Sequence, residues 1–183
     1  EIGCTGAPPL IEAMAAAGLP KAEAAIIGEP SMLKCVTGHK GSSGFDVHVR
    51  GYEVHSSLLD TGVSAILEAV RLINWANDRN AENRAKPRSD MAAKFDPPWT
   101  TLHVGRIWGG TAHNITAKDC RFVLEFRVVP DEDVEAWGDA VRAAATEVER
   151  GMQAVRPSAR IDLDPFFGVP GLKPEKDGAA EAL

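Results

Sequence analysis

Apolar and polar residues alternate through much of the middle of the chain, which is the period-two pattern of half-buried strands. In the stretch 44–50, the apolar residues Phe45, Val47 and Val49 share one face and polar residues occupy the other. The remaining predicted strands are 34–39, 100–108, 120–129 and 160–164. We expect these strands to form a small antiparallel or mixed sheet.

Two other stretches show the spacing of amphipathic helices. One begins at Val63, and the polar, proline-containing stretch 78–98 after it predicts a long surface loop. The other begins near Val134, with Asp131 as its expected N-cap. The element order is strand–strand–helix–strand–strand–helix–strand. This order predicts an α+β, ferredoxin-like two-layer sandwich, with a four-stranded sheet and two helices.

The first 33 residues do not fit that unit by pattern. Thr5–Gly18 reads as a short helix, and the apolar run Ala24–Gly28 predicts a buried strand of a neighbouring α/β domain. The chain begins at Glu1 rather than Met and ends in a Pro-, Gly- and Ala-rich tail, 173–183. We therefore expect it to be a piece of a longer protein.

Composition narrows the classes of partner. The chain has 183 residues, 26 acidic and 20 basic, and a formal net charge of -6 without any Lys/Arg block. We therefore expect no nucleic acid and no anionic membrane as partners. No apolar run approaches the roughly 20 residues that span a bilayer. Cys4, Cys35 and Cys120 form no disulfide framework, which favours a reducing cytoplasm.

Glu29 and His55 are candidate chemical groups. Glu29 follows the predicted strand Ala24–Gly28, and the carboxyl end of a parallel strand is where α/β domains place ligands and metals. The alternative is an exposed turn residue. His55 lies in a loop between a strand and a helix, where it is either a proton carrier or oxyanion donor or an exposed capping residue.

Asn114 and Arg127 are two further candidates. Asn114 follows a Gly109-Gly110 pair, which permits close backbone approach, and its amide is either a hydrogen-bond donor to a ligand or a turn residue. Arg127 interrupts an apolar strand. It is solvated if it points outward, and it can clamp a carboxylate if it lines a cleft.

A series of short motifs, in this order along the chain, resembles the two-zinc aminoacylase/carboxypeptidase family. The motifs are residues 1–7, 28–31, 39–41, 54–57, 62–66, 109–115 and 125–127. Each motif alone has low specificity, whereas the ordered series is specific and covers nearly the whole chain. Ala117 departs from the family, which usually has Pro shortly after the Asn, and this predicts a looser turn.

The resemblance implies a catalytic α/β domain into which a ferredoxin-like lid domain is inserted. It divides this chain into a remnant of the metal-binding catalytic domain (1–33), the lid/dimerisation domain (34–165) and a return segment (166–183). The lid implies a homodimer. The general base and the remaining metal ligands are expected before Glu1 and after Leu183.

The resemblance also implies roles for individual residues. Glu1 and Glu29 match metal ligands of a two-zinc site, in which cobalt is an alternative. His55 matches a lid histidine that reaches the other subunit's active site and stabilises the oxyanion. Four residues match lid residues that bind the polar end of the substrate: Asn114, Arg127, Gly110 and Thr111.

The implied activity is hydrolysis of a small N-acyl amino acid. Residues 95–101 and the His-Ser-Ser at 55–57 favour a member that removes the acetyl group from N-acetylornithine in arginine biosynthesis. Desuccinylation of succinyl-diaminopimelate and general N-acyl-amino-acid hydrolysis are alternatives. From the residues alone, an inactive dimerisation module and a small-molecule regulatory domain also remain open.

Overall fold

The computed structural model describes residues 5–28, 30–32, 34–176 and 178–179. Its ordered centre is a four-stranded antiparallel sheet with the strand order β2-β3-β1-β4. The strands are β1 (Gly41–Arg50), β2 (Thr101–Gly109), β3 (Asp119–Val128) and β4 (Arg160–Val169). The helices are α1 (Ala7–Ala16), η1 (Ser56–Thr61), α2 (Ala65–Ala85), η2 (Ala92–Lys94) and α3 (Val134–Val155).

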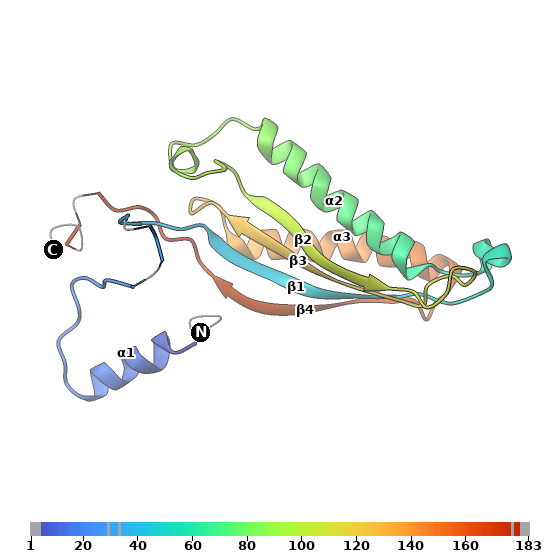
Figure 1. The fold of residues 1–183 in the computed structure, drawn as a ribbon, viewed down its shortest axis with the longest axis horizontal. Helices are drawn as coiled ribbons and strands as arrows, with labels where there is room; N and C mark the ends of the chain where they lie inside the picture. Colours follow the sequence, from blue (N-terminus) through green and yellow to red (C-terminus); the bar gives the residue numbers. More distant parts are fainter. Residues whose placement is uncertain (1–4, 29, 33, 177, 180–183) are drawn as a thin grey trace.

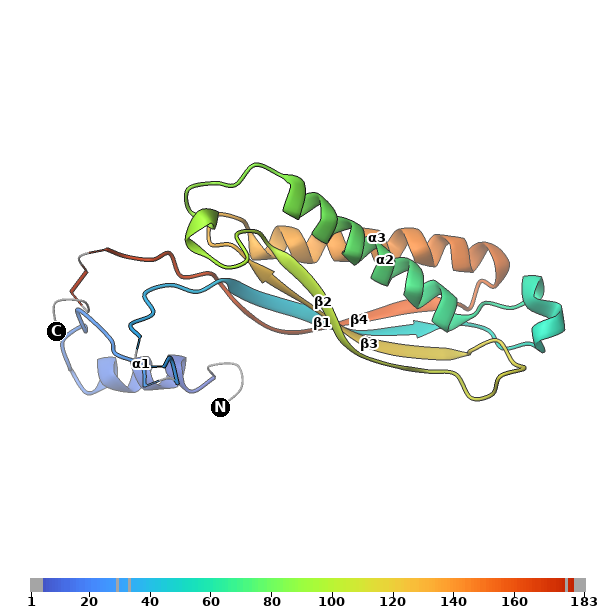
Figure 2. The same cartoon turned by 45° about the horizontal axis from the view of Figure 1, so that its top comes forward.

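The two long helices, α2 and α3, cover one face of the sheet and leave the other face open (Figures 1 and 2). With α2 between β1 and β2 and α3 between β3 and β4, the order is that of a ferredoxin-like α+β sandwich. The predicted fold class is therefore confirmed. None of the helices in the described ranges is both long and apolar enough to cross a bilayer.

The core lies between the sheet and these helices. Alternate residues of the central strands, such as Val47 and Val49 on β1 and Phe122 and Leu124 on β3, are at most 2% exposed. Their alternation with polar neighbours is the pattern from which the strands were predicted. Leu72 of α2, at 0% exposed, completes the layer from the helix side.

Helix α2 extends to Ala85, so the loop prediction for 78–98 is wrong over its first eight residues. Two of the polar residues there bond to the edge strand β2 or to the residue just before it. The Asn80 amide donates to Leu102 O and accepts from Leu102 N, both at 2.8 Å. Asn83, 6% exposed, donates to Thr100 O at 2.8 Å. Asn80 and Asn83 are polar because their side chains satisfy backbone groups of β2 and of Thr100, which precedes it.

Two predicted strands do not form. Residues 34–39 have no strand beside them, and only His39 pairs, through an isolated bridge with Leu172. The run Ala24–Gly28 is likewise not a strand, and its Ile26 and Ile27 are 76% and 72% exposed. A strand needs neighbouring backbone to bond to, and in the described residues these runs have only the single bridge between His39 and Leu172.

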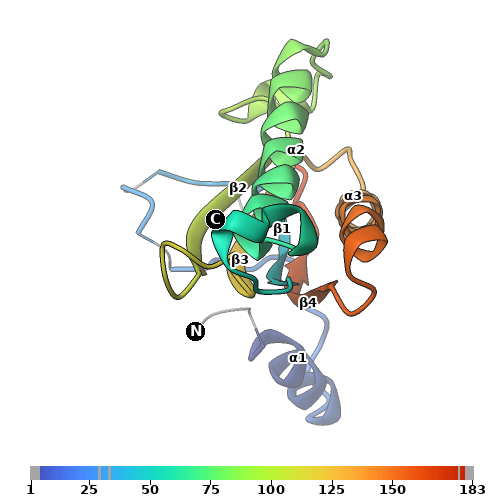
Figure 3. The same cartoon turned by 90° about the vertical axis from the view of Figure 1, so that its right-hand side faces the viewer.

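The other predicted elements occur with shifted bounds. Helix α1 begins with prolines at its first positions, lies apart from the two-layer unit in Figures 1 and 3, and has no buried residue. Asp133 rather than Asp131 caps α3, because its carboxylate accepts from Glu135 N at 2.9 Å. Strand β4 runs on to Val169, past the predicted domain boundary at residue 165.

The contrast between the two faces of α2 is testable. Leu72→Ala removes a fully buried side chain, whereas Leu67→Ala removes one that is 55% exposed on the same helix. We expect Leu72→Ala to lower the free energy of unfolding by about 2–5 kcal/mol and Leu67→Ala by less than about 0.5 kcal/mol. Urea unfolding followed by circular dichroism measures both. Equal losses would contradict the placement of the core.

Candidate functional site

His55 lies just beyond the end of β1, where it bridges Ile115 and caps η1. Its Nδ1 accepts a hydrogen bond from Ser57 N at 3.3 Å and lies 2.9 Å from Ser57 Oγ. A backbone N–H only donates, so Nδ1 is the acceptor and the neutral ring carries its proton on Nε2. His55 is therefore a capping residue that also presents an Nε2–H donor. The two interpretations of this residue are compatible.

Asn114 lies on the neighbouring segment, and its backbone carbonyl oxygen accepts a hydrogen bond from Ser56 N at 2.9 Å. Gly110 and Thr111 precede it in the same loop. Gly110 has a φ of 73°, and its N–H donates to Asp119 O at 3.1 Å, which closes the loop at its base. The structure thus brings Asn114, Gly110 and Thr111 to the end of the sheet that carries His55. We call residues 52–57 and 110–117 the His55 end.

The turn after Asn114 is firmly held. Ala117 is 5% exposed, and its carbonyl oxygen accepts from Ala65 N at 2.8 Å at the start of α2. The looser turn predicted from the absence of Pro at this position is not what the structure shows, because these contacts fix the backbone.

Arg127 lies at the opposite end of the sheet. It is on β3, directly across from Ser42 of β1 and Thr101 of β2. Its guanidinium forms an ion pair with Glu125 on the open face of the sheet. Arg127 therefore points outward, and it also lines a hollow, so both conditions stated for it are met.

That hollow has a volume of about 610 Å³ and lies on the open face. It is lined by His39, Lys40, Ser42, Asp46, Arg106, Val123, Glu125, Arg127, Phe166 and Val169. Partial burial lowers the pKa of Lys40, whose ammonium donates to Pro97 O at 2.6 Å and Trp99 O at 2.8 Å. With Lys40 engaged by the chain, an anionic ligand in this hollow would meet the guanidinium groups of Arg106 and of Arg127, the latter already paired with Glu125.

The two groups of candidate residues cannot meet within one chain. Arg127 pairs with Ser42 at one end of β1, and His55 follows Arg50 at the other end. The eight residue-to-residue steps from Ser42 to Arg50 span roughly 26 Å at about 3.3 Å per step. An amino-acid-sized substrate is much shorter. Asn114, expected beside Arg127 at the substrate's polar end, is instead next to His55 in this chain.

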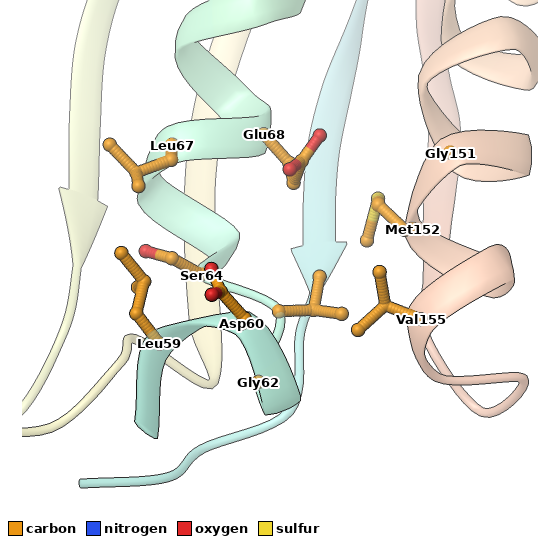
Figure 4. A pocket seen from close by; sticks show the side chains of 10 residues that line it. Leu59, Asp60, Gly62, Ser64, Leu67, Glu68, Gly151, Met152 and Val155 are labelled. Carbon is orange, nitrogen blue, oxygen red and sulfur yellow. The ribbon is translucent and has the colours of Figure 1, made fainter. Parts of the chain in front are cut away.

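A second, smaller pocket lies on the helix side of the sheet, between η1, α2 and α3 (Figure 4). Its volume is about 270 Å³, and most of its side chains are apolar. Glu68, one of its two carboxylates, is paired with Arg71 at 2.9 Å. The pocket contains no histidine and no sequence-predicted site residue. The candidate site residues that the structure describes therefore lie on the open face and at the ends of the sheet and not in this pocket.

The described residues contain no group of three or more His, Cys, Asp or Glu side chains placed to hold a metal ion. Glu1 and Glu29, the predicted ligands, lie outside the described residues. Zinc centres in proteins take at least three protein ligands, so two carboxylates need further ligands to make one. The described part of the chain does not itself form a metal centre.

Ser57 and Glu125 lie within the motifs identified in the sequence, but the sequence assigned neither of them a role. Ser57 orients the His55 ring through its contacts with Nδ1. The residue two positions after a helix N-cap often donates its N–H to the cap side chain, so the spacing of His55 and Ser57 could have indicated this contact. Glu125 pairs with Arg127 because alternate residues of a strand share one face.

Comparison of the sequence with known proteins identifies its family. Residues 37–152 match the family described as the M20 peptidase dimerisation domain. Over 163 residues the chain is 38% identical to the acetylornithine deacetylase of Myxococcus xanthus, covering 88% of this chain and 40% of that protein. Over 129 residues it is 33% identical to a "Probable carboxypeptidase" of Aspergillus fumigatus, covering 69% and 28%. The chain thus spans less than half the length of these curated relatives.

Solved structures share the fold. Aminopeptidase PepT from Bacillus cereus superposes with a TM-score of 0.57 at 22% identity, covering 79% of this chain and 34% of that chain. An amidase of the hydantoinase/carbamoylase family from Burkholderia multivorans gives a TM-score of 0.58 at 18% identity, covering 75% and 30%. Since the family match extends from before β1 into α3 and includes more than half of the chain, the chain belongs to the M20 peptidase dimerisation domain family.

Proposed function

We propose that this chain is the lid and dimer interface of a cytoplasmic, metal-dependent amide hydrolase that removes the acetyl group from N-acetylornithine in arginine biosynthesis. The family and the likeness to an acetylornithine deacetylase support the reaction class. One structural observation carries the proposal: His55 and Arg127 lie at opposite ends of one sheet. A substrate that uses both residues must lie between two copies of the chain.

His55 has the chemistry of an oxyanion donor in this proposal. Attack of water on an amide carbonyl places negative charge on the carbonyl oxygen. Ser57 fixes Nδ1 as an acceptor, so the Nε2–H of the neutral ring is the group that donates to this oxygen. The Asn114 side-chain amide, on the adjacent segment, is a second donor from the same end of the sheet.

Arg127 would hold the substrate's α-carboxylate from the open face of a second chain. A guanidinium matches a carboxylate through two parallel hydrogen bonds. Glu125 restricts the rotamers of Arg127 through their ion pair, which orients the guanidinium over the hollow. Arg127 then supplies a fixed cationic anchor for the substrate's carboxylate, and a mobile lid excludes water.

Two zinc ions, with cobalt as an alternative, would supply the activated water when bound. We assign Glu1 and Glu29 as two of their ligands, and the remaining ligands and the general base to other parts of the complete protein. A second function follows for the chain on its own. Because its described residues form no metal centre, we propose that the isolated chain is an inactive dimerisation module.

The edge strand β2 is the proposed dimer surface. Asn80 covers the edge at Leu102, but every residue of β2 after the Val104/Arg106 register shift is exposed. Apolar side chains gather at this uncovered half: Ile107 is 49% exposed, and Ile66 and Val70 on α2 are 36% and 39% exposed. Unpaired backbone beside apolar side chains suits a second copy of the same strand. We call Ile66, Val70 and Ile107 the edge patch.

Activity is the first test. With Zn²⁺ or Co²⁺ added, we expect the complete protein to release acetate from N-acetylornithine faster than it releases succinate from N-succinyl-diaminopimelate. We expect the 183-residue chain alone to release neither. An acetate-coupled assay measures these rates. If the complete protein turns over no N-acyl amino acid, the proposed reaction is wrong, and if the chain alone hydrolyses one, it is no inactive module.

Mixed dimers test whether the site is shared. We expect the His55→Ala and Arg127→Ala variants of the complete protein each to be inactive. When the two are unfolded together and refolded, half of the dimers carry one intact His55–Arg127 pair, so about a quarter of the wild-type activity should return. Sites built within one chain would regain none. Refolded Arg127→Ala alone is the matched control.

The edge patch makes its own prediction. We expect Ile107→Asp to weaken dimerisation by about tenfold or more, because it buries a charge against apolar side chains. Val155→Asp on α3, where Val155 is 45% exposed, is the control. Sedimentation equilibrium of the chain measures both. A dimer unaffected by Ile107→Asp but lost in the control would place the interface elsewhere.

A further inference from the structure

The His55 end continues the pairing of β1 with β3 beyond the sheet. Gly51 N donates to Lys118 O at 2.7 Å, and Thr116 N donates to Val54 O at 2.9 Å. The bridge between His55 and Ile115 extends the same ladder. The backbone of His55 is therefore placed by a short two-stranded ribbon whose other strand carries Asn114 and Thr116.

Within this ribbon, the Thr116 side chain contacts the backbone of Val54, the residue before His55. Thr116 is 5% exposed, one of the few buried polar residues in the described part of the chain. Its Oγ1 accepts from Val54 N at 2.8 Å and lies 3.1 Å from Tyr52 O and 3.3 Å from Val54 O. One hydroxyl thus accepts from Val54 N–H and donates to a carbonyl oxygen on the strand that leads into His55.

Close packing leaves this hydroxyl little freedom. A Cβ placed on Gly62 would lie 3.0 Å from Thr116 Oγ1 and 2.5 Å from Val54 Cγ2. Tyr52 N and Val63 O bond at 2.9 Å, and Val63 N and Tyr52 O at 3.0 Å, which fixes the strand from its other side. The hydroxyl fills a narrow gap in which the Val54 N–H has no other acceptor among the described residues.

We infer that Thr116 is a positioning residue for His55, an inference that rests on the proposed function of the His55 ring. The hydroxyl holds the backbone of Val54 in place. Because Val54 directly precedes His55, its backbone sets the position of the His55 Cα and hence of the ring. Removing the hydroxyl leaves the Val54 N–H unsatisfied, so the strand shifts to find another acceptor. A shift of this kind moves Nε2 away from the substrate oxygen while the core stays intact.

Three variants separate this role from a general structural one. Thr116→Val removes the hydroxyl at nearly constant shape, and Thr116→Ser keeps it. Thr146→Val is the matched control, because Thr146 Oγ1 donates to Arg142 O at 2.9 Å on α3. In the complete protein, we expect Thr116→Val to lower kcat about tenfold with little change in KM, because misplacement of a catalytic group slows the reaction. Thr116→Ser and Thr146→Val should stay within about twofold of wild type.

A spectroscopic measurement on the 183-residue chain keeps the inference independent of the reaction. We expect Thr116→Val to shift the His55 ring signals in a ¹H–¹⁵N spectrum, and Thr116→Ser and Thr146→Val to leave them in place. Unmoved His55 signals in folded Thr116→Val would overturn the inference. Absence of turnover in the wild-type protein would instead overturn only the proposed function.

Hydrogen exchange of the unmodified chain covers the case in which Thr116→Val does not fold. Because Thr116 Oγ1 accepts from Val54 N, we expect the Val54 amide to exchange as slowly as amides of the β1–β3 ladder. Exchange of the Val54 amide at the rate of an exposed loop would show that the hydroxyl does not hold it, and the inference would fail.

Discussion

The pairing of β1 with β3 is the constraint on which the rest of this molecule depends. Its register turns Val47 and Leu124 toward the helices and turns the opposite set of residues to the open face. A slip by one residue would exchange the two faces and expose the core. The same ladder, continued past its end, sets His55 beside Ile115, and its other end sets Arg127 across from Ser42. Core and site are therefore fixed by one set of backbone bonds.

Because the sheet is rigid, the separation of His55 from Arg127 is a property of the domain and not of a particular loop conformation. Buried side chains from both long helices pack against the central strands, so bending the sheet would open the core. This rigidity explains why a dimerisation domain is a natural carrier for half-sites. If His55 and Arg127 act on one substrate, as proposed, the two ends of the sheet supply unlike groups that two copies of the chain would bring together.

The strands were predictable because each alternates in its own sequence, and Phe45 or Phe122 reveals its face without knowledge of its neighbours. The failures share a different cause. The runs 34–39 and Ala24–Gly28 are predicted as strands from local pattern but have no partner strand in the described residues. Asn80 is polar and was therefore predicted to lie in a loop, but its side chain bonds to the backbone of Leu102, which the sequence alone does not reveal. Likewise His55 was identified from its motif, whereas its distance from Arg127 depends on register, which local sequence does not encode.

The edge strand β2 links the positions of His55 and Arg127 to the proposed dimer. The Gly109 end of β2 is the His55 end, because Gly109 pairs with Cys120, and Cys120 pairs with Val49 near the end of β1. If two copies pair through the uncovered halves of β2 about a two-fold axis, the strands run antiparallel and the second sheet is reversed. The His55 end of each copy then points toward the Arg127 end of the other. A two-fold dimer through the opposite edge, β4, would reverse the second sheet in the same way, and by the strand order it would leave β1 of one copy and β3 of the other separated by the same number of strands. The exposed apolar side chains of the edge patch are therefore what favours β2 as the contact.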